Sequence, residues 1–178
     1  MDPGAGKVEE LVLALGARAT VSFDPNIRPA LVGDQDSALG RFERLASLAD
    51  LVKLSDEDAA FLYPDLSPKE AANVVATLGP IVAVTKGANG SVLTAGAGTV
   101  EIKAVTAPVS DTVGAGDSYM SALLWALLVT RRTRVRPITN KELAQAGAFA
   151  AKAAAITVGR PGAEPPTLYE VEGRRLPT

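Results

Sequence analysis

The residues best placed to do chemistry form a glycine loop, the octet Asp111–Ser118 with sequence DTVGAGDS. Gly114 and Gly116 flank one alanine, so the backbone can bend sharply and turn several N–H groups toward one point. A strongly apolar segment, 117–129, follows and predicts a helix. The dipole of that helix adds positive potential at its N-terminus. The loop is therefore suited to an anion that gains charge during a reaction.

Asp117 lies at the start of the predicted helix, within reach of the same point. A carboxylate there can orient a substrate hydroxyl and accept its proton, which contributes roughly 10²–10⁴-fold in rate. One well-aimed backbone donor contributes about 3–4 kcal/mol to a transition state. We expect the loop and the carboxylate to contribute similarly to the rate of a phosphoryl transfer, because that reaction depends mainly on positioning and charge stabilisation.

Other interpretations of the glycine motifs stay open. Asp is a preferred helix N-cap, so Asp117 could be only a cap and the glycines only a turn. A dinucleotide-binding loop would need G-x-G-x-x-G, but Tyr119 occupies the third glycine position. The segment Gly4–Lys7 resembles the end of a P-loop but lacks the following Ser or Thr, and we interpret it as a chance match.

Composition narrows the chemistry further. The 178 residues include no histidine and no cysteine, which excludes imidazole relays, His-ligated metals, thiolate nucleophiles and disulfides. The formal net charge is −2 and 47% of the residues are hydrophobic, which indicates a globular protein without a nucleic-acid partner. The start, Met1–Gly4, lacks signal-peptide features, and the longest apolar run, Ala122–Val129, is far below the roughly 20 residues that span a bilayer. We therefore expect a cytoplasmic protein without a membrane partner.

The segments that must position the loop alternate between strand-like and helix-like patterns. The predicted strands are 19–23, 51–54, 81–85, 91–94 and 99–103. The predicted helices are 8–15, 37–48, 55–63, 67–78, 117–129 and 140–156, followed by a tail, 159–178, without a clear period. This alternation predicts an α/β fold with a largely parallel sheet, in one domain over residues 1–178. Ligands of such sheets bind beyond the carboxyl ends of the strands. The candidate positions are the loops after Phe23, Leu54, Thr85 and Lys103.

Four segments together resemble the PfkB, or ribokinase-like, family of carbohydrate kinases. The octet 111–118 is similar to the family's C-terminal signature. The other three segments are similar to its fructokinase branch, its nucleotide loop and the run beside its adenine pocket: 23–31 (FDPNIRPAL), 85–91 (TKGANGS) and 160–163 (RPGA). The resemblance covers about residues 8–167. It implies a ribokinase-like three-layer α/β/α sandwich of which this chain is the C-terminal part, with the N-terminal half and its lid missing.

The resemblance implies ATP-dependent phosphorylation of a sugar hydroxyl, with fructose to fructose 6-phosphate as the leading reaction. Asp117 would be the base, and the amides of Gly114, Ala115 and Gly116 would form the anion hole. The implied ATP contacts are Thr85, Lys86, Gly87, Gly90, Gly116 and Ala151. The implied sugar contacts are Asp24, Asn26, Arg28 and Asp117.

The same resemblance implies two cations. Mg²⁺ would bridge the ATP phosphates, with Asp58 as its acidic protein contact. Here Ser55-x-x-Asp58 replaces the family's Asn-x-x-Glu, and a helix cap with an acidic first turn explains it equally well. K⁺ would be held by backbone carbonyls near Asp111 and Val113. The basic run Arg131–Arg136 predicts a solvated face rather than a phosphate site.

Three functions therefore stay open: a sugar kinase or its catalytic half, a nucleotide-binding module without catalysis, and a truncated remnant of such a kinase. The chain alone is expected to be weakly active or inactive, because the absent half would position the sugar and exclude water. A sheet edge left exposed by that absence would favour association, such as a homodimer.

Overall fold

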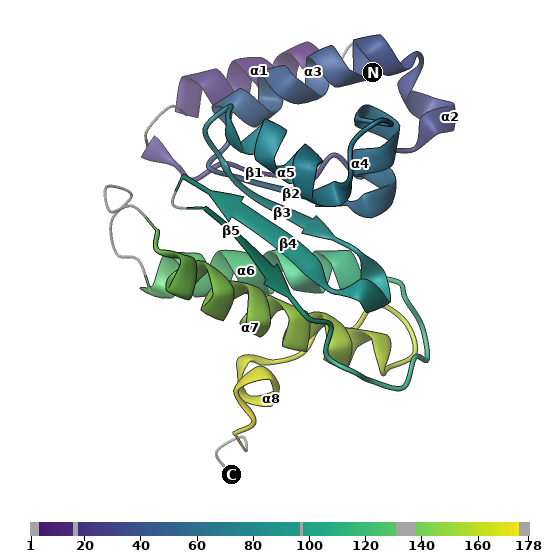
Figure 1. The fold of residues 1–178 in the computed structure, drawn as a ribbon, viewed down its shortest axis with the longest axis vertical. Coiled ribbons are helices and arrows are strands. Elements are labelled where there is room, and N and C mark those ends of the chain that lie inside the picture. Colours follow the sequence, from purple (N-terminus) through teal and green to yellow (C-terminus); the bar gives the residue numbers. More distant parts are fainter. Residues whose placement is uncertain (1–3, 16–17, 97, 131–137, 175–178) are drawn as a thin grey trace. The chain divides into compact units, whose positions relative to one another are not determined.

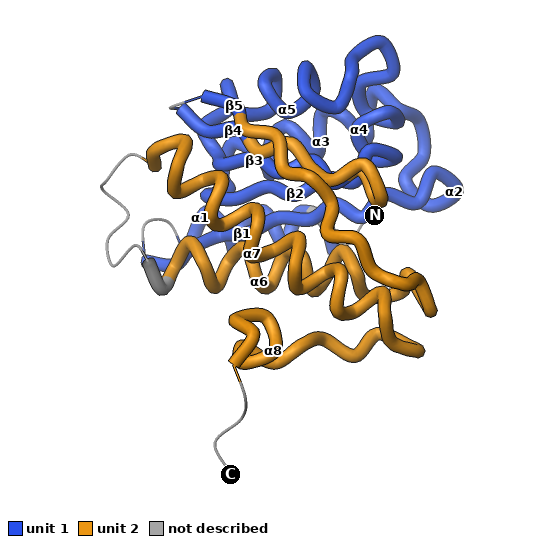
Figure 2. Tube along the Cα trace, turned by 60° about the horizontal axis from the view of Figure 1, so that its bottom comes forward, with its two compact units in different colours: residues 1–85, 94–99 blue, residues 86–93, 100–178 orange. Residues whose placement is uncertain are grey.

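The computed structural model describes residues 4–15, 18–96, 98–130 and 138–174 (Figure 1). The basic run Arg131–Arg136 lies outside these residues. The chain divides into two compact units, which Figure 2 distinguishes by colour: unit 1 comprises 1–85 and 94–99, and unit 2 comprises 86–93 and 100–178. Strands β4 (Ser91–Ala95) and β5 (Gly98–Ile102) contribute residues to both units, and the strand order in the sheet is β1-β2-β3-β4-β5.

Unit 1 is built on three parallel strands with helices between them. The strands are β1 (Ser22–Phe23), β2 (Leu51–Ser55) and β3 (Ile81–Thr85). The helices are α1 (Gly4–Leu15), α2 (Pro29–Val32), α3 (Gln35–Leu48), α4 (Asp56–Leu62) and α5 (Pro68–Ala76). β1 pairs with β2 and β2 with β3, both in parallel, with Phe23 opposite Val52 and Ser55 opposite Thr85. The carboxyl ends of the three strands therefore meet at one edge.

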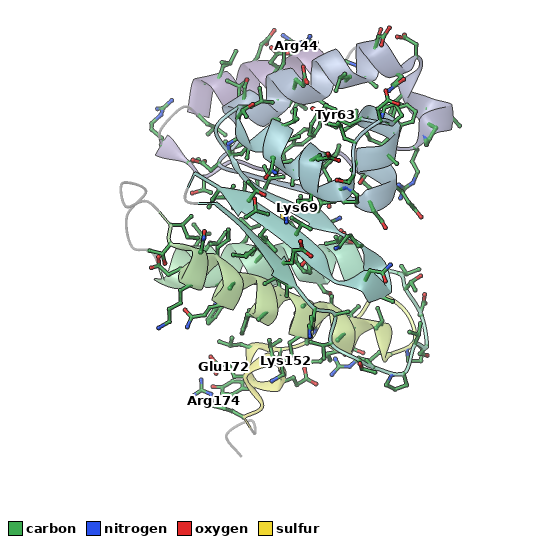
Figure 3. All side chains as sticks on the ribbon, viewed as in Figure 1. Arg44, Tyr63, Lys69, Lys152, Glu172 and Arg174 are labelled. Carbon is green, nitrogen blue, oxygen red and sulfur yellow. The ribbon has the colours of Figure 1, made fainter. Side chains whose placement is uncertain are left out.

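The core of unit 1 is formed by apolar side chains of these strands and by an aromatic cluster. The Phe42 ring lies 5.8 Å from that of Phe23 and 6.4 Å from that of Tyr63, centroid to centroid. Tyr63, labelled in Figure 3, also donates a hydrogen bond to the carboxylate of Glu43. The largest fully buried side chains of the unit are Leu51, Val52, Leu54, Leu62, Val75, Val82 and Val84. Such burial explains why β2 and β3 read as almost continuous apolar runs.

Unit 2 is dominated by two long helices, α6 (Ala115–Thr130) and α7 (Asn140–Val158), which pack side by side (Figure 1). It also contains the 3₁₀ turn η2 (Gly87–Asn89) and α8 (Leu168–Glu172). The indole of Trp125 stacks on Phe149 with centroids 5.0 Å apart. The Thr157 hydroxyl donates to that of Ser118 at 2.7 Å, which joins the N-terminal turn of α6 to the end of α7.

The predicted α/β class with a largely parallel sheet is confirmed, while several element boundaries differ. The strand expected over 19–23 is reduced to Ser22–Phe23. The short helices α2 and α8 occupy segments predicted to be a loop and an irregular tail. α8 forms because Thr167 and Glu170 make a reciprocal capping box. The P-loop-like segment Gly4–Lys7 is the first turn of α1. Among the helices described, none is long and apolar enough to cross a membrane.

Gly90 provides a test of this packing. Its φ is +82°, and a Cβ added there would lie 2.0 Å from the Ile102 carbonyl oxygen and 2.9 Å from the Ala104 nitrogen. Gly90→Ala should lower the free energy of unfolding by about 2–5 kcal/mol, because it adds backbone strain to overpacking. Urea denaturation measures the change. The control is Gly96→Ala, where no described atom outside the neighbouring residues lies within 4 Å of the new Cβ. Equal losses for the two variants would contradict the packing at Gly90.

Candidate active site

The predicted anion loop leads into the N-terminus of α6. Gly114 precedes the helix with φ +77°, and its carbonyl accepts the Ser118 N–H at 2.9 Å. Within the described part of the chain, the N–H groups of Gly114, Gly116 and Asp117 have no hydrogen-bond acceptor. Unpaired amides at a helix N-terminus bind anions readily, because the helix dipole is positive there.

The structure differs from the predicted anion hole at Ala115. The N–H of Ala115 donates to the Thr112 carbonyl at 3.3 Å, because the residues before the helix close a turn of their own. That distance is longer than a typical N–H···O bond. Among the amides described, the unpaired N–H groups at this helix end are therefore those of Gly114, Gly116 and Asp117.

Asp117 is the third residue of α6, so it is not the N-cap of that helix. Its side chain is exposed and makes no hydrogen bond or ion pair with any described residue. The two residues after it are buried: Ser118 bonds to Thr157, and the Tyr119 hydroxyl lies 2.8 Å from that of Ser91. Burial raises the pKa of Tyr119 to about 12. The helix is thus anchored by its inner face while the carboxylate faces outward.

Asp111 holds the loop against the C-terminal segment of unit 2. Its Oδ1 accepts the Val113 N–H at 3.0 Å and its Oδ2 accepts the Gly162 N–H at 3.1 Å. The bond from Val113, and then that from Gly162, lowers the pKa of Asp111 below its ordinary value. A Cβ at Gly114 would meet the Ala163 side chain at 2.8 Å. The structure therefore brings the segments 111–117 and 160–163 together, a contact that their separation in the sequence does not indicate.

The predicted nucleotide loop is a tight turn in unit 2. The N–H of Lys86 donates to the Gly90 carbonyl at 2.7 Å, which closes the 3₁₀ turn between them. Gly87 is exposed with φ +50°, whereas Gly90 is buried. Thr85 ends β3 in unit 1, and its hydroxyl donates to the Leu54 carbonyl at 3.3 Å. Ala151, predicted to contact ATP, is a buried residue of α7, with 7% of its surface exposed.

In unit 1 the predicted sugar contacts comprise one half-buried residue, Asp24, and two exposed ones, Asn26 and Arg28. Asp24 is held by Lys53, whose Nζ lies 2.9 Å from Asp24 Oδ2. The other oxygen, Oδ1, is buried without a partner among the described residues. One oxygen of Asp24 is therefore engaged by the protein itself, and its role as a sugar contact stays a prediction. Asn26 and Arg28 are exposed, and Asn26 has the unusual φ of +43°.

Asp58 is likewise engaged by the protein. It is buried, with 5% of its surface exposed. Its Oδ1 accepts the Ile27 N–H at 2.8 Å and its Oδ2 accepts the Ser55 N–H at 2.9 Å. These bonds favour the cap interpretation of Ser55-x-x-Asp58 over the expected magnesium role. In the described ranges, no group of three or more acidic side chains is arranged to hold a metal ion.

Sequence reasoning missed Lys53 as part of this arrangement. No motif marks it, but a charged residue inside the apolar run Leu51–Leu54 was an available signal, because a buried charge requires a partner.

Comparisons with known proteins agree with these observations. The profile of a family described as pfkB family carbohydrate kinase matches residues 2–168. A fructokinase of Rhizobium leguminosarum bv. trifolii is 36% identical over 135 residues, 70% of this chain and 40% of that protein. The structure of Vibrio cholerae fructokinase with fructose, ADP and calcium bound superimposes with a TM-score of 0.77 at 26% identity, covering 91% of this chain and 52% of that one. Aminoimidazole riboside kinase from Salmonella enterica gives 0.73 at 28% identity, covering 87% and 51%. The chain thus spans about half the length of these relatives, and its ribokinase-like α/β fold is established.

We call the two hydrogen bonds that Asp111 accepts from Val113 and Gly162 the Asp111 tether. The tether predicts a pH dependence of the free energy of unfolding that Asp111→Asn should remove. A carboxylate whose pKa is lowered by folding stabilises the protein above its unfolded pKa and loses that effect as the pH falls through the folded pKa. The stability difference between wild type and Asp111→Asn should therefore be largest at neutral pH and shrink as the pH falls below 3.8. Urea midpoints across this range measure it. The matched control is Asp65→Asn at an exposed position, and a difference for Asp111→Asn that stays constant with pH would exclude the tether.

Proposed function

Because the chain belongs to the pfkB family of carbohydrate kinases, we propose that it transfers the γ-phosphoryl group of ATP to a sugar hydroxyl, or forms the catalytic part of a kinase that does so. One observation carries the proposal. At the N-terminus of α6 an exposed carboxylate, Asp117, stands in the same helical turn as amides that have no acceptor in the described chain. Phosphoryl transfer needs both a hydroxyl-orienting base and donors for the transferred group.

The proposed step uses these groups in defined roles. Asp117 accepts the proton of the sugar hydroxyl while the hydroxyl oxygen forms a bond to the γ-phosphorus of ATP. The bond from that phosphorus to the β–γ bridging oxygen breaks, and ADP leaves with the electron pair. The amides of Gly114 and Gly116 donate to the equatorial oxygens of the transferred group, at about 3–4 kcal/mol for each well-aimed donor. The φ of +77° at Gly114 shapes this turn, and a glycine adopts it without steric cost.

Fructose is the proposed sugar. Its support is the likeness to the Rhizobium fructokinase and to the Vibrio structure that holds fructose and ADP. Within this chain, Asn26 and Arg28 are the exposed polar residues of the Asp24–Arg28 loop. The likeness to aminoimidazole riboside kinase makes that riboside the competing substrate, so both should be assayed.

We also propose, from the family membership, where this chain would bind ATP and two cations. Lys86 and Gly87 would contact ATP from the turn after β3. Mg²⁺ would be held by the phosphates and water, as it commonly is in nucleotide sites, since both oxygens of Asp58 already accept backbone hydrogen bonds. The backbone carbonyls of Asp111 and Val113 would hold K⁺, next to the loop that the Asp111 carboxylate fixes.

A second candidate function is nucleotide binding without catalysis. Unit 2 contains all three segments that resemble the family's nucleotide-binding motifs: 86–90, 111–117 and 160–163. The second and third of these segments are hydrogen-bonded to one another. A chain that spans about half of its relatives can retain such a unit without the groups that position a sugar. Binding of ADP with Mg²⁺ without turnover would favour this function.

Asp117→Asn tests the proposed base. The amide keeps the shape of the carboxylate but cannot accept the hydroxyl proton, so kcat should fall roughly 10²–10⁴-fold. A coupled assay of ADP release with each sugar measures kcat, and titration calorimetry should show ADP affinity within about twofold of wild type. Asp65→Asn serves as the exposed control. Unchanged kcat in Asp117→Asn would overturn the base assignment, and a wild type that neither turns over nor binds ADP would overturn both candidate functions.

Two substitutions at Asn26 separate the roles of its side chain and its backbone. Asn26→Gly permits the φ of +43° but removes the amide, whereas Asn26→Ala also strains the backbone by about 1–2 kcal/mol. If the amide contacts the sugar, both variants should raise the sugar KM about tenfold, the equivalent of one lost hydrogen bond, with the ATP KM unchanged. Only the alanine variant should lower the unfolding midpoint. A wild-type sugar KM in Asn26→Gly would show that the side chain does not contact the substrate.

A further inference from the structure

Lys53 occupies an unusual position for a charged residue. It lies in the middle of β2, between Val52 and Leu54, and only 6% of its surface is exposed. A buried ammonium is costly unless a partner and hydrogen bonds compensate it. Its presence in an otherwise apolar strand therefore calls for a specific contact within unit 1.

That contact is the carboxylate of Asp24, the residue that follows β1. Because β1 pairs with β2 in parallel and Phe23 stands opposite Val52, Asp24 follows at the level of Lys53. The Lys53 Nζ lies 2.9 Å from Asp24 Oδ2, with both side chains largely buried. The first residue of the loop Asp24–Arg28 is thus fixed to the central strand by an ion pair.

A second contact fixes the same loop at Ile27, three residues after Asp24. The Ile27 N–H donates to Asp58 Oδ1 at 2.8 Å, and Asp58 is itself fixed by the Ser55 N–H on its other oxygen. Between the two holds stand Pro25, whose ring restricts φ, and Asn26, whose φ is +43°. A non-glycine residue in this region persists only where its surroundings determine it.

We propose that Lys53 is a positioning residue that, together with Asp58, clamps the Asp24–Arg28 loop and so sets the direction of Asn26 and Arg28 toward the sugar. The inference rests on the proposed kinase function. Lys53 acts through Asp24 and does not itself touch the substrate. A clamp of this kind limits loop motion before the sugar binds, and a misplacement of about 1 Å in such groups can cost about 10²-fold in rate.

The test is the double variant Lys53→Met/Asp24→Asn in the full chain. Replacing both partners avoids an unpaired buried charge, so the protein should stay folded with a similar unfolding midpoint. Hydrogen exchange should then show the Ile27 amide exchanging about tenfold faster, because the loop has lost one of its two holds. The amides of Leu93 and Ala150, in unit 2, should exchange as in wild type. The control is Lys7→Met/Glu10→Gln, which removes an ion pair with side-chain exposures of 78% and 66%.

Ligand affinities provide the functional readout. Titration calorimetry with fructose in the presence of ADP and Mg²⁺ should show sugar affinity reduced about tenfold in the clamp variant. ADP affinity should stay as in wild type, a split that a general loss of stability would not produce.

Each outcome is decisive. Unchanged exchange at Ile27 overturns the clamp, whatever the sugar result. Faster exchange with unchanged sugar affinity shows that the pair serves only stability and overturns the positioning role. A wild type that binds no sugar overturns the proposed substrate and with it the positioning role, while the exchange data still decide whether the loop is clamped.

Discussion

The first turn of an α-helix cannot hydrogen-bond its own N–H groups, and the site is organised around that constraint. At α6 the N–H groups of Gly114, Gly116 and Asp117 are left without an acceptor among the described residues. Gly114 has no side chain with which to cap them, and Asp111 bonds to Val113 and Gly162 instead. Ala163 lies so close to Gly114 that a side chain at this position would not fit. N–H groups that water solvates do not lower the stability of the fold. They can bind an anion when it replaces that water.

Helix α4 resolves the same constraint in the opposite way. Asp58, like Asp117, is the third residue of its helix. At α4 the N-cap is Ser55, and serine and aspartate satisfy each other's backbone in a capping box. At α6 the equivalent position before the helix is a glycine, so the carboxylate of Asp117 has no such partner in the described chain. The identity of the capping residue therefore decides whether an acidic residue in the first turn is structural or available for chemistry.

The parallel register of unit 1 adds a further consequence. Loops that leave parallel strands at the same edge can be tied to one another, and here the loop after β1 is bonded to β2 and to the start of α4. These bonds fix a loop that contains two exposed polar residues, Asn26 and Arg28. Position in the fold, rather than charge alone, separates the residues that face solvent from those that hold them in place.

The sequence by itself determined the α/β class, the principal helices and strands, and the motifs that mark the family, because these depend on local periodicity, capping residues and glycine spacing. The short helices α2 and α8 were not predicted, because their stretches carry no clear period, although Thr167 and Glu170 were a local capping signal for α8. The sequence could not determine which carboxylates are free. The residue type alone does not show whether a carboxylate is paired, as in the four residues Asp24, Asp58, Asp111 and Asp117. Only the tertiary structure showed that Asp24 faces a buried lysine, that Asp58 and Asp111 bind backbone amides, and that Asp117 is exposed. The physical reason is that a carboxylate's role depends on the donors brought to it by residues distant in the chain, 51 positions away in the case of Asp111 and Gly162.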